Sequence, residues 1–207
     1  MNSNPEIVVA LTGASGTLYG FRLLMALLSR PMTVHLIVSD AGRKVAMHET
    51  DWAGEDLAAY LAKGGAPIHP EATLNCWEPE DLFAPPASGS HAHGGMVIIP
   101  CSMKTLGAVA SGLSDTLIHR AADVCLKERR PLLLVTRETP LNLIHMENML
   151  RVARAGATLL PASPSFYFKP STIEELVDTV VARVLDHLHL SAPNTRRWGE
   201  ETPCIKI

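Results

Sequence analysis

The segment from Met96 to Glu138 reads MVIIPCSMKTLGAVASGLSDTLIHRAADVCLKERRPLLLVTRE. It contains two apolar runs typical of buried strands, residues 96–100 and 132–136, and each run ends in polar and cationic residues where the chain turns. In an open parallel sheet, ligands bind at the carboxyl ends of the strands. The two strand ends therefore supply the first candidate site residues, which are Ser102, Lys104, Thr105, Arg137 and Glu138.

Strand-like and helix-like segments alternate along the rest of the chain. Short apolar runs at 6–12, 33–38 and 157–160 are typical of strands, because they are too short for helices. Helical spacing of apolar residues predicts helices at about 13–29, 41–49, 55–63, 106–112, 115–129 and 142–155. Strands that alternate with helices predict an α/β fold with a doubly wound parallel sheet, a Rossmann-like three-layer sandwich.

Two further features complete the predicted organisation. Residues 64–95 are rich in Gly, Pro, Ala and Ser and lack periodicity, so we predict an irregular segment there, either a functional loop or a mobile excursion. The residues Ser171-Thr172-Ile173-Glu174 precede an apolar periodic run and predict a capping box for a last long helix. The chain is expected to form one large domain over residues 1–207, in which 190–207 is a C-terminal tail.

Composition narrows the class of protein. The 207 residues are 47% hydrophobic, which is enough for a sizeable core, and the net charge of -3 argues against a nucleic-acid-binding surface. No apolar run reaches the roughly 18 residues that a membrane helix needs, and the start of the chain has no signal-peptide pattern, so we expect a cytoplasmic protein. The four cysteines lack a C-x-x-C pair, which predicts reduced thiols.

The first motif is Gly13-Ala14-Ser15-Gly16, where the first strand turns into the first helix. Glycines allow a ligand to approach the backbone, and the amides at a helix start attract anions such as phosphate. The spacing departs from the G-x-G-x-x-G of dinucleotide binders, and Ser39 stands where an acidic ribose ligand would follow the second strand. A tight turn without a ligand is an equal alternative.

The second motif is Pro100 to Thr105, PCSMKT. Two hydroxyls, a lysine and exposed amides at a strand end suit phosphate or the polar atoms of a flavin. The alternative is an ordinary helix cap by Ser102. Cys101 has no partner base in a recognisable motif, so a buried thiol is the better interpretation.

The histidine pairs His91/His93 and His187/His189 could suggest a metal site. No third ligand is evident beside either pair, so no metal site is predicted.

Together, these segments resemble the flavin prenyltransferases of the UbiX family. The resemblance covers roughly residues 6 to 190, and it rests on the segments GASGTLYG, VSDAGRKVAMHET, ASGS, MVIIPCSMKT, IHRAADVCLKERRPLLLVTRETPLN and PSFYFKP. It implies a metal-independent transferase that joins the dimethylallyl group of dimethylallyl monophosphate to N5 and C6 of reduced FMN. The product, prenylated FMN, would serve a UbiD-type decarboxylase.

The resemblance also assigns residues. FMN contacts fall on Gly13, Ala14, Ser15, Ser39, Ser102, Met103, Lys104, Thr105 and Arg137. Contacts to the prenyl phosphate fall on Arg120, Lys127, Arg137, Tyr167 and Arg183, with Trp198 over the prenyl site. Several cations around one phosphate would neutralise it and stabilise the leaving group.

Two carboxylates complete the implied machinery. Glu138 would handle a proton at the phosphate, and Glu49 would work with Ser15 near the flavin N5. Either carboxylate could instead be a simple salt-bridge partner. An aromatic residue usually follows the SGS element in the family, whereas this chain has His91.

The resemblance finally implies a homo-oligomer, a dodecamer, whose flavin pocket is completed by neighbouring subunits. Segments 106–118 and 142–155 could supply the contacts, although a buried core face explains them equally well. Two other functions stay open, a flavin-dependent cysteine decarboxylase and a flavin carrier without chemistry of its own.

Overall fold

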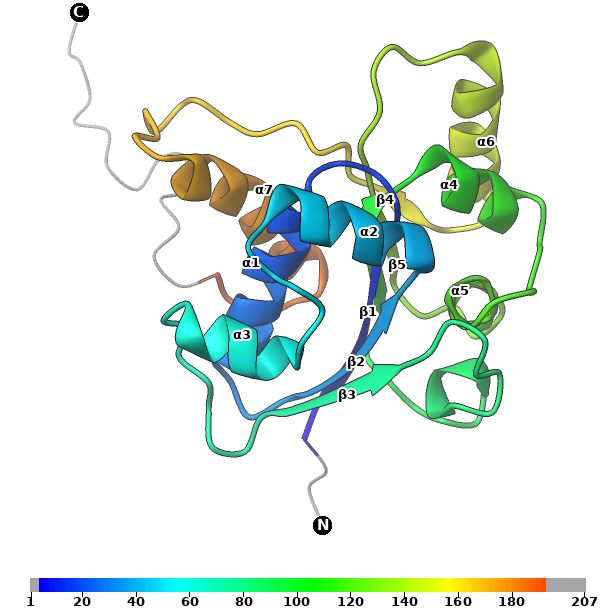
Figure 1. Ribbon diagram of the computed structural model, residues 1–207. Helices are drawn as coiled ribbons and strands as arrows, with labels where there is room; N and C mark the ends of the chain where they lie inside the picture. The colour runs from blue at the N-terminus through cyan, green and yellow to red at the C-terminus, as the bar shows by residue number, and fades with distance from the viewer. Residues whose placement is uncertain (1–3, 193–207) are drawn as a thin grey trace, which may run out of the picture.

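The computed structural model describes residues 4–192, which form a single six-stranded sheet with helices on both faces (Figure 1). Every strand pair is parallel, and the strand order is β3-β2-β1-β4-β5-β6. The strands are β1 (Glu6–Leu11), β2 (Thr33–Val38), β3 (Thr73–Trp77), β4 (Met96–Cys101), β5 (Leu132–Thr136) and β6 (Thr158–Leu159). This order is that of a Rossmann-like fold, as predicted.

The strand order reverses between β1 and β4, which lie side by side at the centre of the sheet. From β1 the chain winds outward through β2 and β3, and from β4 it winds the other way through β5 and β6. Connections therefore leave the carboxyl ends of β1 and β4 in opposite directions, and a crevice opens between them. The two motifs recognised in the sequence follow directly after these two strands.

Alternating residues of the central strands divide the core into two layers. Ile7, Val9 and Leu11 pack on one face, with helices α1, α2, α3 and α7, whereas Val8 and Ala10 pack on the other face, with α4, α5 and α6. The helices are α1 (Thr17–Leu28), α2 (Asp40–Glu49), α3 (Leu57–Lys63), α4 (Met103–Ala110), α5 (Leu117–Lys127), α6 (Leu143–Arg154) and α7 (Ile173–His187), and a 3-10 turn, η1, spans Pro85–Ala87. The three-layer sandwich follows from this arrangement.

The structure corrects two sequence-based expectations. The segment 64–95 is not irregular throughout, because β3 pairs with β2 along its whole length as the edge strand. The N-cap of α7 is Thr172 in place of the predicted Ser171. Its side chain accepts a bond from the Glu175 amide, while the Glu175 carboxylate accepts from the amide and hydroxyl of Ser171.

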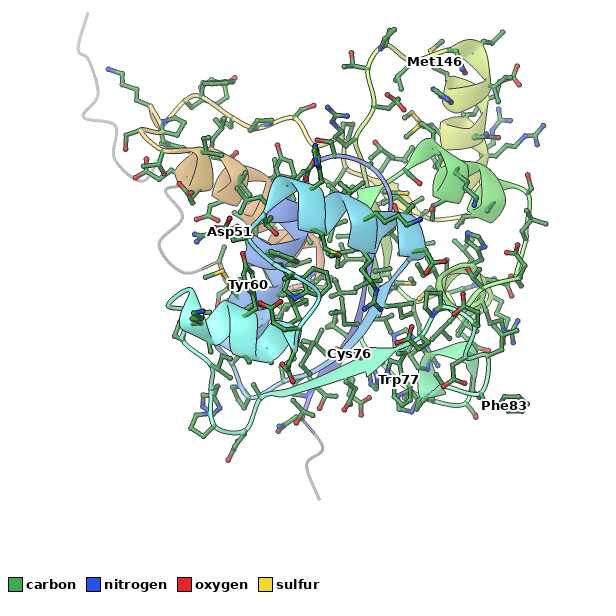
Figure 2. All side chains as sticks on the ribbon, viewed as in Figure 1. Asp51, Tyr60, Cys76, Trp77, Phe83 and Met146 are labelled. Atoms are coloured by element: carbon green, nitrogen blue, oxygen red, sulfur yellow. The ribbon has the colours of Figure 1, made fainter. Side chains whose placement is uncertain are left out.

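The helices α4, α5 and α6 lie near their predicted positions, but they differ in burial. The apolar side chains of α4 and α5 are mostly in the core, whereas Val152 is the one buried residue of α6. Leu143, Ile144 and Met146 of α6 are 48–67% exposed. Met146 projects from the outer end of α6 in Figure 2.

Among residues 4–192, none of the helices has the length and apolar character needed to cross a bilayer.

Candidate functional site at the carboxyl edge of the sheet

The turn from β1 to α1 is built around a carboxylate from another helix. Glu49, the last residue of α2, accepts bonds from the Gly16 amide at 2.9 and 3.1 Å and from the Thr17 amide at 2.9 Å. Gly16 has a φ of +110°, which glycine adopts without strain, and its position offers no side-chain cap to α1. Glu49 therefore provides the cap of α1 from a distance of 33 residues in sequence.

This cap changes the predicted anion site. We expected the amides at the start of α1 to be free for a phosphate, but the Glu49 carboxylate already binds two of them. Glu49 is also hydrogen bonded to the Ser15 side chain, so the structure brings together the two residues that the resemblance paired. Burial raises the pKa of Glu49, and the bonds from Ser15 and the two amides outweigh that effect and lower it overall.

Gly13 and Ser39 hold the neighbouring helix against this turn. A side chain at Gly13 would place its Cβ only 2.5 Å from the Cβ of Ala41, so glycine is needed for α2 to begin this close to the turn. Ser39 is the N-cap of α2, and its hydroxyl accepts the Gly42 amide at 3.0 Å. The cap uses one lone pair of Ser39, and its hydroxyl proton stays available to a ligand.

A buried hydroxyl ties the two central strand ends together. Thr12 Oγ1 donates to the Pro100 carbonyl at 2.7 Å and accepts the Ser102 amide at 2.8 Å. Thr12 is only 2% exposed. We did not identify Thr12 from the sequence, since a threonine at the end of an apolar strand carries no signal of a contact 90 residues away.

The PCSMKT motif forms the start of α4, as predicted. Ser102 is the N-cap and its Oγ accepts the Thr105 amide at 3.3 Å, so the capping interpretation of Ser102 is correct. Thr105 is buried, whereas Lys104 is exposed and Ser102 and Met103 are half-buried at the crevice. Cys101 is fully buried, and burial raises the pKa of its thiol to about 12, which excludes it as a nucleophile at neutral pH.

Arg137 and Glu138 follow β5 and are exposed at the same edge of the sheet. The Arg137 amide donates to the Cys101 carbonyl at 3.3 Å, which places it beside the end of β4. Its guanidinium lies close enough to Tyr19 on α1 to offset part of the rise that burial causes in the pKa of the Tyr19 phenol. Tyr19 therefore belongs to the candidate site, although the sequence analysis treated the first turn of α1 only as a helix pattern.

Arg120 and Lys127 do not join this group within one chain. Arg120 donates to the Ala87 carbonyl at 3.0 Å and pairs with Asp123, and Lys127 pairs with Glu128. Lys127 ends α5 near the amino end of β5, while Arg137 follows its carboxyl end. The five residues of β5 separate the two ends by roughly 17 Å.

The remaining predicted prenyl-phosphate residues come from the segment around α7. Tyr167 is 76% exposed in the loop before α7, and Arg183, on α7, pairs with Asp186 at 3.0 Å and is also exposed. The α7 helix is held against α1 by an ion pair between Arg22 and Asp178. Trp198 lies outside the described residues.

Comparison with known proteins identifies the family of this chain. Residues 1–185 match the family model described as Flavoprotein. The chain is 48% identical to the flavin prenyltransferase UbiX of Pseudomonas aeruginosa over 96% of its length and 97% of that protein. It is 43% identical to the mitochondrial flavin prenyltransferase PAD1 of Saccharomyces cerevisiae, over 93% of this chain and 75% of PAD1.

The chain belongs to the UbiX family of flavin prenyltransferases.

Two solved structures of UbiX proteins match the fold closely. AnUbiX (PadA1), in complex with FMN and dimethylallyl pyrophosphate, has a TM-score of 0.87 and 42% identity over 96% of this chain and all of that one. A dodecameric FMN-dependent UbiX-like decarboxylase from Escherichia coli O157:H7 has a TM-score of 0.84 and 42% identity over 93% of this chain and 98% of that one. The family that the sequence motifs indicated is thereby confirmed.

Proposed function

We propose that this UbiX protein joins a dimethylallyl group to reduced FMN, forming bonds at N5 and C6 of the flavin and releasing phosphate. The observation that supports it best is the convergence of Ser15, Glu49, Ser102 and Arg137 around the crevice between β1 and β4. Relatives that match almost the full length of the chain are flavin prenyltransferases. A solved relative binds both FMN and a dimethylallyl donor.

The flavin would lie along the carboxyl edge of the sheet. Gly13, Ala14 and Ser15 would contact it from one side of the crevice, and Ser102, Met103, Lys104 and Thr105 from the other. Ser39 has a free hydroxyl proton to donate, and Arg137 supplies fixed positive charge. FMN supplies the nucleophilic atoms of the reaction when it is reduced and bound.

Ser15 and Glu49 are the proposed groups for proton movement next to the flavin. The Ser15 hydroxyl is bonded to the Glu49 carboxylate, which is held ionised by that bond and by the amides of α1. An ionised carboxylate can accept, through Ser15, the proton that C6 must lose when the new ring closes. The same contacts fix the position of Glu49, so little reorganisation is needed.

The donor phosphate would be held by Lys127, Arg120, Arg137, Tyr167 and Arg183. These groups share positive charge or a phenolic hydroxyl, and together they would neutralise the phosphate and stabilise the charge on it as the allylic C–O bond breaks. Glu138 is exposed beside Arg137 and would exchange a proton with the phosphate. Trp198 would cover the prenyl group.

Lys127 and Arg137 lie toward opposite ends of β5 within one chain, so we infer that neighbouring copies complete the pocket. Leu143, Ile144, Met146 and Leu150 form an exposed apolar face on α6. A solved relative is a dodecamer. Exposed apolar area of this kind is typical of a protein interface, which favours a homo-oligomer of this chain, a dodecamer as in that relative.

The reaction can be tested directly. The purified protein is mixed without air with reduced FMN and, in separate runs, dimethylallyl monophosphate or dimethylallyl pyrophosphate, and the flavin is analysed by mass spectrometry. We expect the flavin to gain one C5 prenyl unit, and the faster run identifies the donor. An unmodified flavin in both runs contradicts the proposal.

A second experiment addresses the alternative of a decarboxylase, because one solved relative carries that description. The protein is incubated with oxidised FMN and a peptide with a C-terminal cysteine. We expect no loss of carbon dioxide from the peptide. Decarboxylation would favour the alternative, and flavin binding without chemistry in either experiment would favour a carrier.

The interface is tested by Ile144→Lys, which places a charge on the exposed face of α6. We expect a smaller assembly by light scattering with an unchanged far-ultraviolet spectrum. Ile68→Lys, at a partly exposed position before β3, is the control and should keep the full assembly.

The proposed recipient of the product, a UbiD-type decarboxylase, is tested by adding an apo form of such an enzyme and measuring whether its activity appears.

A further inference from the structure

A second cluster of polar side chains lies at the opposite end of the sheet from the flavin crevice. Glu6, the first residue of β1, approaches His35 of β2 and His91 from the loop before β4. Its Oε2 lies 2.8 Å from His35 Nε2 and 2.9 Å from His91 Nε2. The ligand atoms of these three residues all lie within 4.8 Å of one another.

The histidine His93 adds a third imidazole to this cluster. It is buried, and its ring lies 6.4 Å from the ring of His91. Its Nδ1 lies 3.1 Å from the Gly95 carbonyl and 3.3 Å from the Gly95 amide, so it can donate to the first or accept from the second. In the tautomer that donates to the carbonyl, Nε2 carries the lone pair. That Nε2 is the one buried side-chain nitrogen or oxygen in residues 4–192 without a hydrogen-bond partner.

We propose that Glu6, His91 and His93 bind a divalent transition-metal ion of the zinc class. A carboxylate and two imidazoles form a donor set that Zn²⁺ accepts readily, with a fourth position for water. With an ion on Nε2, His93 would take the tautomer in which Nδ1–H donates to the Gly95 carbonyl, and a backbone carbonyl is a common outer partner of metal-binding histidines. We had predicted no metal site because no third ligand was evident, and Glu6 supplies that ligand.

Glu6 and His91 are close to metal-binding separation, whereas His93 lies outside the group whose ligand atoms are within 4.8 Å of one another, so its ring would have to turn toward them. The 2.9 Å between Glu6 Oε2 and His91 Nε2 would open to about 3.3 Å on a tetrahedral Zn²⁺ ion. Two imidazoles on the same ion have ring centres about 5 Å apart, so His93 and His91 would approach by roughly 1 Å. The side chains of Glu6 and His91 are 23% and 29% exposed, which leaves an entry path for the ion.

The structure assigns His35 to a supporting role. The Trp77 indole N–H donates to His35 Nδ1 at 3.0 Å, so the proton of a neutral His35 is on Nε2 and points at Glu6. A metal at His35 Nε2 would have to displace this proton and break the Trp77 bond. His35 therefore orients the Glu6 carboxylate through a hydrogen bond, as outer partners of metal ligands do. Figure 2 shows Trp77 at the end of β3.

One fixed cation lies near the proposed site. Arg130 contributes to the lowered pKa of His93, after the larger effect of burial. Its guanidinium donates to the carbonyls of Gly89 and His91 at 2.6 and 2.8 Å, so the group is directed to the loop backbone and the negative charge of Glu6 is left for the ion. A bound ion would fasten the loop 88–95 to the start of β1.

The test is a titration of the full-length protein, freed of metal by a chelator, with ZnCl₂ in a calorimeter. We expect one Zn²⁺ per chain with a dissociation constant in the micromolar range or tighter, and tetrahedral absorption bands when Co²⁺ replaces Zn²⁺. Glu6→Gln, His91→Gln and His93→Gln should each weaken binding at least about tenfold. His187→Gln, on the exposed surface of α7, is the control and should bind as the wild type does.

Three outcomes would overturn the proposal. They are binding only in the millimolar range, unchanged binding by His93→Gln, or equal loss in the His187→Gln control. Trp77→Phe tests the ligand set, because a tighter site in this variant would mean that His35 itself is a ligand, whereas unchanged or weaker binding supports its outer position. Folding of each variant is checked by circular dichroism without metal, and none of these readouts depends on prenyl transfer.

Discussion

The carboxyl edge of the sheet, called the flavin edge below, and the proposed phosphate-binding cations differ in how well a single chain holds them in place. Thr12, Ser15, Glu49 and Ser102 are held in place by hydrogen bonds between the ends of β1, β4 and α2. Among the phosphate-binding candidates, Lys127 and Arg183 are exposed and Arg120 is half-buried, and each of the three pairs with an acidic residue nearby in the sequence. The first region is preorganised by the fold, whereas the second depends on what comes to lie against it.

This difference indicates which part of the function a single chain can perform without a neighbour. A rigid edge can position a flat cofactor without a neighbour, because its donors cost little to order. Long lysine and arginine side chains gain a defined position only when a phosphate or another copy of the chain fixes them. We therefore expect flavin binding and prenyl transfer to respond separately to mutation.

The largest expected effect is that of Lys127→Ala. Loss of this cation should lower kcat about 10²–10³-fold, because the charge on the departing phosphate loses a partner. FMN affinity should stay unchanged, since Lys127 lies at the other end of β5 from the flavin edge. Anaerobic turnover by mass spectrometry and flavin fluorescence titration measure the two quantities.

Subunit mixing sharpens this result. Lys127→Ala and Glu49→Gln chains are unfolded together, refolded and assayed, and part of the activity should return if one pocket takes Lys127 and Glu49 from different chains. Each variant refolded alone is the control. If the mixture is no more active than either variant, the pocket is not shared in this way.

Thr12→Val should have the next largest effect, now on the preorganised edge. The isosteric change leaves the Ser102 amide without its partner, while the Pro100 carbonyl loses the hydroxyl and keeps the Thr12 amide. The expected cost is about 1–3 kcal/mol in the free energy of unfolding. Flavin affinity should fall as well, since the ends of β1 and β4 are no longer tied. Urea denaturation measures the first quantity, and Thr12→Ser, which keeps the hydroxyl, should retain most of the stability.

Glu49→Gln should cost about 1 kcal/mol through the weakened cap of α1. The folded-state pKa of Glu49 lies below its ordinary value of 4.5, so the carboxylate stabilises the fold above that pH. The contribution is lost as the pH falls through the folded-state pKa. The stability difference between wild type and variant should therefore be constant above pH 4.5 and shrink below it, as measured by thermal unfolding across pH.

A neutral control separates the cap from the general effect of acid. Glu80→Gln removes an exposed carboxylate elsewhere and should leave the pH profile of the wild type in place. An acid profile of Glu49→Gln that matches the wild type would contradict the assigned role.

The smallest effect is expected for Glu128→Gln, which removes the surface partner of Lys127. Exposed ion pairs contribute little to folding, so the melting temperature should not change measurably. The KM for the dimethylallyl donor should fall, since Lys127 no longer has a competing carboxylate. A large loss of stability would mean that Glu128 has a structural role.

Much of the fold could be predicted from the sequence, because its signals are local. The run LLLVT after ERRP and the run TVHLIV have strand composition and sharp ends, and both strands lie where expected. The edge strand β3 was missed because TLNCW lies on the rim of the sheet, where its half-exposed side chains lack a continuous apolar run. The glycine- and proline-rich residues on either side of β3 also favoured the prediction of a loop.

The site was predictable where it follows strand ends and not where it depends on long-range contacts. Ser102 and Arg137 could be placed at the carboxyl edge of the sheet from the sequence because they follow β4 and β5. The cap of α1 by Glu49, the bridge through Thr12 and the position of Tyr19 beside Arg137 join residues that are distant in sequence. The separation of Lys127 and Arg137 could not be predicted from the sequence either, because it depends on the direction of α5 relative to β5.

The carboxylate of Glu49 at the start of α1 also bears on how a flavin can be oriented. The positive end of that helix is already neutralised, and a phosphate placed there would meet a negative charge at hydrogen-bonding distance from the same amides. An uncharged ring system meets no such repulsion. We therefore expect the aromatic part of a flavin to lie toward Ser15 and its anionic tail to lie in another part of the crevice.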